Sequence, residues 1–189
     1  MISNVIRTKM DKAATFTAVL LVVIIFPATG CNSKTKPTPT NFIQVLNAYF
    51  LEHPECLLSG VRFPYATSDS AMTKQLNTLV KSQLLESSYE TAVRTTRYTV
   101  ARAGTRYAPR FCYGHRAVNS IDSFTTPAKG ASGFPETRVT YRYAIEDVPV
   151  WAKSSDVLAA FPEMANALAH GGSGQATLAQ TLAGWQVPE

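Results

Sequence analysis

The sequence predicts a small single domain of the α+β class, in which helices and antiparallel strands alternate along the chain. Apolar residues between Met72 and Leu84 recur at helical spacing, which indicates an amphipathic helix. Residues 136–148 alternate between apolar and polar side chains, which indicates a strand with one buried face. The length of 189 residues is that of one domain, and 46% hydrophobic residues argue against wholesale disorder.

Two helices are expected in the first half of this domain. Residues 41–51 place apolar side chains on one helix face, and Asn41 is the expected N-cap. The second helix is expected to start at Asp69 or Ser70 and to run to about Glu86.

The second half is expected to be rich in strands. Residues 110–126 and 136–148 are separated by a glycine and proline turn region, so we expect an antiparallel pair. A short helix follows, restarted by Pro162 as a first-turn proline. Residues 170–189 open with a glycine-rich break and are expected to form a flexible or weakly helical tail. The globular domain is therefore predicted to span residues 41–169.

The first thirty residues differ from the rest of the chain. Residues 1–12 carry Arg7, Lys9 and Lys12 against a single acid, and residues 13–27 carry no charge. This is the pattern of a secretory signal peptide. As a helix the apolar run would span about 22 Å, which is short of the ~30 Å hydrocarbon core of a bilayer.

Residues 28–31, Ala-Thr-Gly-Cys, resemble the lipobox of lipoproteins of Gram-negative bacteria. The resemblance implies cleavage before Cys31, attachment of a diacylglyceryl group to Cys31, and anchoring of the protein in membrane lipid. Ala28 departs from the leucine usual in this motif, and Asn32 is compatible with sorting to the outer rather than the inner membrane. Residues 31–40 would form a flexible tether facing the periplasm. Ordinary secretion and an uncleaved anchor remain the alternatives.

Besides the acylated Cys31, cleavage would leave two cysteines, Cys56 and Cys112, and a net charge of +3 from 15 basic and 12 acidic residues. In an oxidising compartment a disulfide is the expected state of this pair. Closing the loop between them would stabilise the fold by roughly 4 kcal/mol through chain entropy. Two separate buried thiols are the alternative.

A second resemblance concerns the middle of the chain. Residues 75–87 (QLNTLVKSQLLES), followed after a gap by residues 97–108 (RYTVARAGTRYA), resemble the recognition helix and wing strands of winged helix-turn-helix domains. Gln83 stands where that family often has glycine. The resemblance implies a helix followed by a strand and a glycine turn; it is a statement about topology and not about activity.

The segment from residue 90 to residue 122 holds the most unusual charge pattern. Between Glu90 and Asp122 there is no acidic residue, and six arginines are interleaved with tyrosines. Such a segment can bind anions, for example phospholipid headgroups, lipopolysaccharide phosphates or an acidic protein. A solvated face is the competing interpretation. The six anion-binding candidates are Arg94, Arg97, Arg102, Arg106, Arg110 and Arg116.

Catalytic and metal-binding patterns are weak. His53, His115 and His170 are scattered without ligand spacing, so neither a metal nor another cofactor is expected. Cys112 with His115 is the one local pair that could form a nucleophile, and the disulfide competes with it. The aromatic side chains could line a ligand groove, but the core is their expected place.

We therefore expect a membrane-anchored envelope lipoprotein that acts as a non-catalytic binding module. A hydrolase whose site is assembled only by the fold is the first alternative. A membrane-tethered nucleic-acid binder is the second. Export removes nucleic acid from the expected partners, because the basic flank at Arg7, Lys9 and Lys12 should stay inside while the rest crosses.

Overall fold

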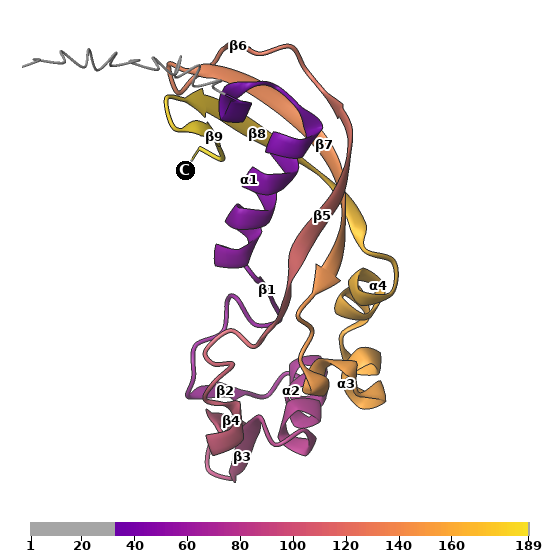
Figure 1. Ribbon diagram of the computed structural model, residues 1–189. Helices are drawn as coiled ribbons and strands as arrows, with labels where there is room; N and C mark the ends of the chain where they lie inside the picture. Colours follow the sequence, from indigo (N-terminus) through magenta and orange to yellow (C-terminus); the bar gives the residue numbers. More distant parts are fainter. Residues whose placement is uncertain (1–32, 189) are drawn as a thin grey trace, which may run out of the picture. The chain divides into compact units, whose positions relative to one another are not determined.

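The computed structural model describes residues 33–188, which combine helices with antiparallel sheets (Figure 1). The predicted α+β class is confirmed. The helices are α1 (Pro39–Glu52), α2 (Ser70–Lys81), α3 (Ser155–Ala160) and α4 (Pro162–His170), with 3₁₀ turns at Ser33–Thr35, Arg102–Gly104 and Val150–Lys153. The strands are β1 (Glu55–Cys56), β2 (Tyr65–Thr67), β3 (Leu85–Glu90), β4 (Thr95–Val100), β5 (Cys112–Phe124), β6 (Ala128–Lys129), β7 (Pro135–Glu146), β8 (Gly172–Thr181) and β9 (Gly184–Gln186).

A large antiparallel sheet in the order β1-β5-β7-β8-β9 packs against α1 (Figure 1). β5 and β7 pair as expected, and β7 directs Val139 and Tyr141 into the core while Arg138 and Arg142 face solvent. The helix α1 covers this face with apolar side chains one turn apart. The buried core residues between helix and sheet are Phe42, Leu46, Phe50, Val118, Val139, Tyr141, Leu178 and Trp185.

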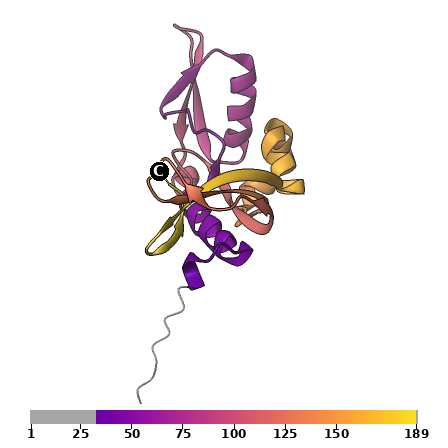
Figure 2. The ribbon, with the colours of Figure 1, turned by 90° about the horizontal axis from the view of Figure 1, so that it is seen from above.

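A small sheet in the order β2-β4-β3 lies with α2 in the segment between β1 and β5. Figure 2 shows α2 running beside this sheet, and α3 contacts α2. We call the set of residues 57–111 and 148–170 the small-sheet lobe. It has its own core, which includes Leu76, Leu79 and Tyr98, each fully buried.

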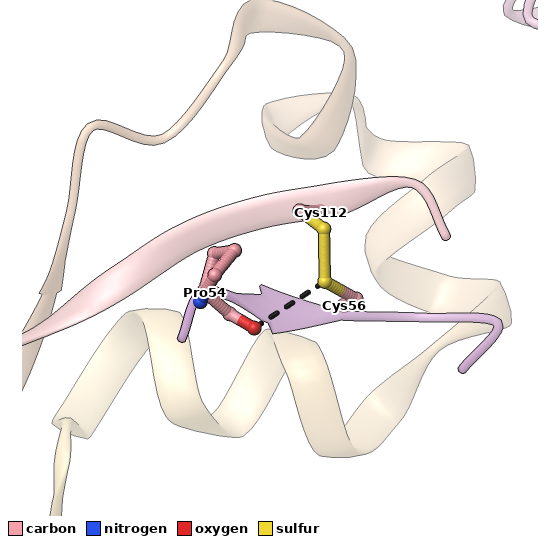
Figure 3. Close-up of a disulfide and its surroundings, with 3 residues drawn as sticks. All are labelled: Pro54, Cys56 and Cys112. Carbon is pink, nitrogen blue, oxygen red and sulfur yellow. Dashed lines mark hydrogen bonds between the residues drawn. A yellow bond between two sulfur atoms is a disulfide. The ribbon is translucent and has the colours of Figure 1, made fainter. Parts of the chain in front are cut away.

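The predicted disulfide between Cys56 and Cys112 is present and joins β1 to the start of β5 (Figure 3). The carbonyl oxygen of Pro54 lies 3.3 Å from Cys56 Sγ. The two cysteines are 56 residues apart in sequence, so the bridge closes the whole segment that contains β2, α2, β3 and β4. It therefore holds together the two points at which the chain enters and leaves that segment.

The second helix ends five residues earlier than predicted. Asp69 is its N-cap, as expected, but the helix stops at Lys81 and β3 begins at Leu85. Gln83 adopts φ 60°, the left-handed conformation that glycine adopts most easily. Leu84 continues the helical spacing, but it lies in the turn between α2 and β3, where its side chain joins the same core as Leu76 and Leu79. Gln83 therefore has the conformation for which glycine would be favoured.

The predicted flexible tail at residues 170–189 is wrong. Residues 172–181 form β8, which pairs along most of β7, and residues 184–186 form β9. The glycines that indicated a linker lie opposite aromatic residues: Gly172 is paired with Tyr143, and Gly174 with Tyr141. In each pair the tyrosine ring packs over the glycine of the neighbouring strand. Glycine, which has no side chain, is therefore needed here for close packing and does not indicate a flexible linker.

This pairing predicts the cost of adding one methyl group. A Cβ on Gly174 would lie 2.6 Å from Cζ of Tyr141, which is only 2% exposed and packs in the core beneath α1. Gly174→Ala is expected to lower the free energy of unfolding by about 1–3 kcal/mol through overpacking. Ser173→Ala, an exposed neighbour on the same strand, should leave stability within about 0.5 kcal/mol in urea denaturation. Equal stabilities of the two variants would contradict this packing.

The predicted domain boundary at residue 41 also lies too far along the chain. Thr38, and not Asn41, is the N-cap of α1, because Pro39 fills the first turn, where a backbone N–H is not needed. The predicted tether contributes to the fold as well: the Lys36 carbonyl accepts a hydrogen bond from Trp185 Nε1 at 3.1 Å. The structured unit thus extends beyond residues 41–169 at both ends.

The predicted signal peptide at residues 1–30 and the lipidation site at Cys31 lie outside the described residues. Within residues 33–188, no helix is long and apolar enough to cross a bilayer.

Candidate functional site

A groove of about 780 Å³ lies along α2 in the small-sheet lobe. One wall is α2 itself; the others come from the end of β2, from β3, β4 and the turn between them, and from α3. The hollow beside the disulfide is smaller, about 410 Å³. Most of the groove side chains are hydroxyls or cations. The groove residues are Thr67, Ser68, Ser70, Thr73, Lys74, Asn77, Thr78, Lys81, Tyr89, Arg94, Thr96, Asp156, Ala159 and Ala160.

The helix wall follows directly from the amphipathic pattern of α2. Leu76 and Leu79 point into the core, so the opposite face of the helix presents its polar side chains to the groove. Lys74, Asn77 and Lys81 recur at three- and four-residue spacing and therefore lie in one row along the helix. The sequence thus dictates a continuous polar row once the apolar face is buried.

Asn77 is oriented by a buried tyrosine. Tyr98 is fully buried, and its hydroxyl donates to Oδ1 of Asn77 at 2.9 Å. Burial raises the pKa of Tyr98, so its hydroxyl stays protonated and keeps donating. With Oδ1 occupied, the Nδ2 group is left as a donor of two hydrogens, and it has no partner within residues 33–188.

The electrostatic balance of the groove is positive. Lys74, Lys81 and Arg94 contribute three positive charges and Asp156 contributes one negative charge, a net +2. None of the three cations forms an ion pair within the described part of the chain. Unpaired cations lining a hollow attract anions.

The six candidate arginines do not form one surface. Arg94, in the β3–β4 turn, lines the groove. Arg97 pairs with Glu90, and Arg116 pairs with Glu55. The guanidinium of Arg116 also lies 4.7 Å from the ring centroid of Tyr143, so this arginine joins β1, β5 and β7. The remaining three, Arg102, Arg106 and Arg110, are exposed between β4 and β5.

The other chemical candidates are placed in structural roles. Cys112 is bonded to Cys56, so it is not a free nucleophile beside His115. Nδ1 of His115 lies 3.5 Å from Asp147 instead. Within residues 33–188 no group of three or more histidine, cysteine, aspartate and glutamate side chains could hold a metal ion.

The aromatic residues are where the core interpretation places them. Tyr141 and Trp185 are buried beneath α1, and Trp151 and Phe161 are buried in the small-sheet lobe. Tyr143 is half-buried, against Arg116.

The chain was compared with known protein families, curated proteins and solved structures. No protein-family model, no curated protein and no solved structure matches the chain. The site is therefore interpreted from its own geometry.

Proposed function

We propose that this chain is a membrane-anchored envelope lipoprotein that binds an anionic ligand in the groove along α2 without catalysing a reaction. The observation that carries the binding role is the set of three unpaired cations, Lys74, Lys81 and Arg94, lining one hollow. Hydroxyl groups from Thr67, Ser70 and Thr96 surround them and can donate to anionic oxygens.

The proposed location rests on the N-terminal pattern. A basic segment, an uncharged apolar run and Cys31 in a lipobox-like motif favour export and acylation. Two acyl chains anchor a protein durably, whereas one holds it only marginally. The disulfide between Cys56 and Cys112 is consistent with an oxidising compartment, and the outer membrane is the proposed site.

The winged-helix resemblance stays a proposal about topology alone; its support is that the hairpin of β3 and β4 follows α2 directly in the chain. In an exported protein the positive groove would serve an anionic envelope component or an acidic protein, and nucleic acid is not the proposed ligand.

A charge-removal experiment tests the binding role. The full chain, purified from membranes in non-ionic detergent, is titrated calorimetrically with inorganic tripolyphosphate as the probe. The Lys74→Gln, Lys81→Gln, Arg94→Gln triple variant should bind at least about tenfold more weakly, because one lost hydrogen bond to a charged group is worth about 1.5–3 kcal/mol and about 1.4 kcal/mol is a tenfold change in affinity. Binding should also weaken as salt is raised.

The matched control removes three charges elsewhere. Lys129, Arg138 and Lys153 are exposed and do not line the groove, so their triple glutamine variant has the same net charge as the test variant. It should keep most of the affinity. Equal losses in both variants, or no binding by the unmodified chain, would contradict a specific anion site.

A further inference from the structure

We propose that the groove ligand is a single molecule with two anionic groups about 10 Å apart, joined by a segment that accepts hydrogen bonds. This inference rests on the proposed function and names the class of ligand for the same groove. Phosphate and carboxylate groups both satisfy it, and phosphate is used as the probe chemistry below.

The spacing comes from α2. Lys74 and Lys81 are seven residues apart, which is close to two helical turns, so they lie on the same face of the helix. At 1.5 Å per residue their backbones are about 10 Å apart along the helix axis. Both side chains are exposed and line the groove. A single small anion therefore contacts one of these two ammonium groups well, and an extended ligand contacts both.

The side chains between Lys74 and Lys81 on α2 determine which chemical groups fit between the two anionic groups of the ligand. Asn77 is one turn from each lysine, and Tyr98 leaves its Nδ2 hydrogens free to donate. The hydroxyl of Thr78 instead donates to the Lys74 carbonyl at 3.1 Å, so its proton is already used. The row along the helix is therefore a cation, an amide donor and a second cation. An acceptor such as an ester, ether or hydroxyl oxygen matches the middle position.

Two linked contacts give a characteristic dependence on ligand length. Once the first anionic group is bound, the second binds at the effective concentration set by the linker. The gain is absent when the linker is too short to span the two lysines, is largest near the matching length, and falls again for longer linkers. A flat response to length would be typical of a diffuse positive surface instead.

The test compares α,ω-alkanediol bisphosphates of increasing length with a monoalkyl phosphate, using the full chain in non-ionic detergent. We expect the best bisphosphate to bind on the order of a hundredfold more tightly than the monophosphate. Its affinity should be highest when its phosphates can lie about 10 Å apart. Lys74→Gln and Lys81→Gln should each remove this gain. They should change monophosphate affinity about twofold, because one lysine still remains.

A diethylene-glycol-type bisphosphate of the best length tests the middle position. Its ether oxygens accept hydrogen bonds, so it should bind more tightly than the alkane probe, and Asn77→Asp should reverse that preference. Lys153→Gln, outside the groove, should change none of these affinities.

The possible results separate the two proposals. Equal affinities for the mono- and bisphosphates, with binding still dependent on Lys74 and Lys81, would overturn this inference and leave the proposed anion site standing. Binding to phosphatidylglycerol vesicles that no soluble bisphosphate displaces would also overturn it, because the ligand would then be a membrane surface. Absence of binding to any phosphate probe or vesicle would overturn both proposals.

Discussion

Removing the disulfide with the Cys56→Ser, Cys112→Ser double variant is expected to lower the free energy of unfolding by about 4 kcal/mol. The bridge closes a loop of 56 residues, and the chain-entropy relation assigns about this stabilisation to a loop of that length. The loss is a large fraction of the 5–15 kcal/mol that is typical of whole proteins. Urea denaturation of the oxidised protein and the double variant measures it.

The reduced, unsubstituted protein is the control for the serine side chains. It lacks the same bridge and carries no substitution, so its midpoint in urea should match that of the double variant. A difference of less than about 1 kcal/mol between oxidised and reduced protein would show that the segment between Cys56 and Cys112 needs no covalent closure.

Trp185→Ala is expected to cost about 3–5 kcal/mol, which is the range for truncating a large buried aromatic side chain. Trp185 is 3% exposed, and its ring lies edge-on to that of Phe42 at 5.1 Å between centroids. Its indole N–H donates to the Lys36 carbonyl, so the residue links β9 to the segment that precedes α1. Thermal and urea denaturation should both show the loss.

Leu182→Ala provides a matched comparison three residues away. Leu182 is 99% exposed in the turn between β8 and β9, so its truncation should change stability by no more than about 0.5 kcal/mol. If residues 170–189 formed a flexible tail, neither Trp185→Ala nor Leu182→Ala would change the stability of the protein. The pair therefore distinguishes a strand that belongs to the core from a tail that does not.

The elements that the sequence could predict are those whose periodicity comes from one buried face. The strand at residues 136–148 and the helix starting at Asp69 have such faces, and both are present. Residues 172–181 could not be predicted in this way, because the neighbour that makes Gly174 compatible with a strand is Tyr141, 33 positions earlier. Glycine spacing alone does not distinguish a linker from a strand covered by aromatic rings.

The candidate site likewise has one part that could be predicted from the sequence and one part that could not. Lys74, Asn77 and Lys81 stand at helical spacing in the sequence, so their common row was predictable from the polar side of the same helix. The candidate arginines drew attention instead, since six basic residues without an acid are conspicuous. Only tertiary structure assigns Arg97 and Arg116 to ion pairs and brings Asp156 of α3 to the groove.

Both the anchor and the compartment can be tested in a single measurement, the intact mass of the protein extracted from membranes. The proposed function predicts a chain that begins at Cys31, carries the added mass of a diacylglyceryl group, and lacks the two hydrogens lost when Cys56 and Cys112 form their disulfide. A mass corresponding to the full 189 residues, or to a cleaved chain without acyl groups, would contradict a lipid-anchored envelope protein.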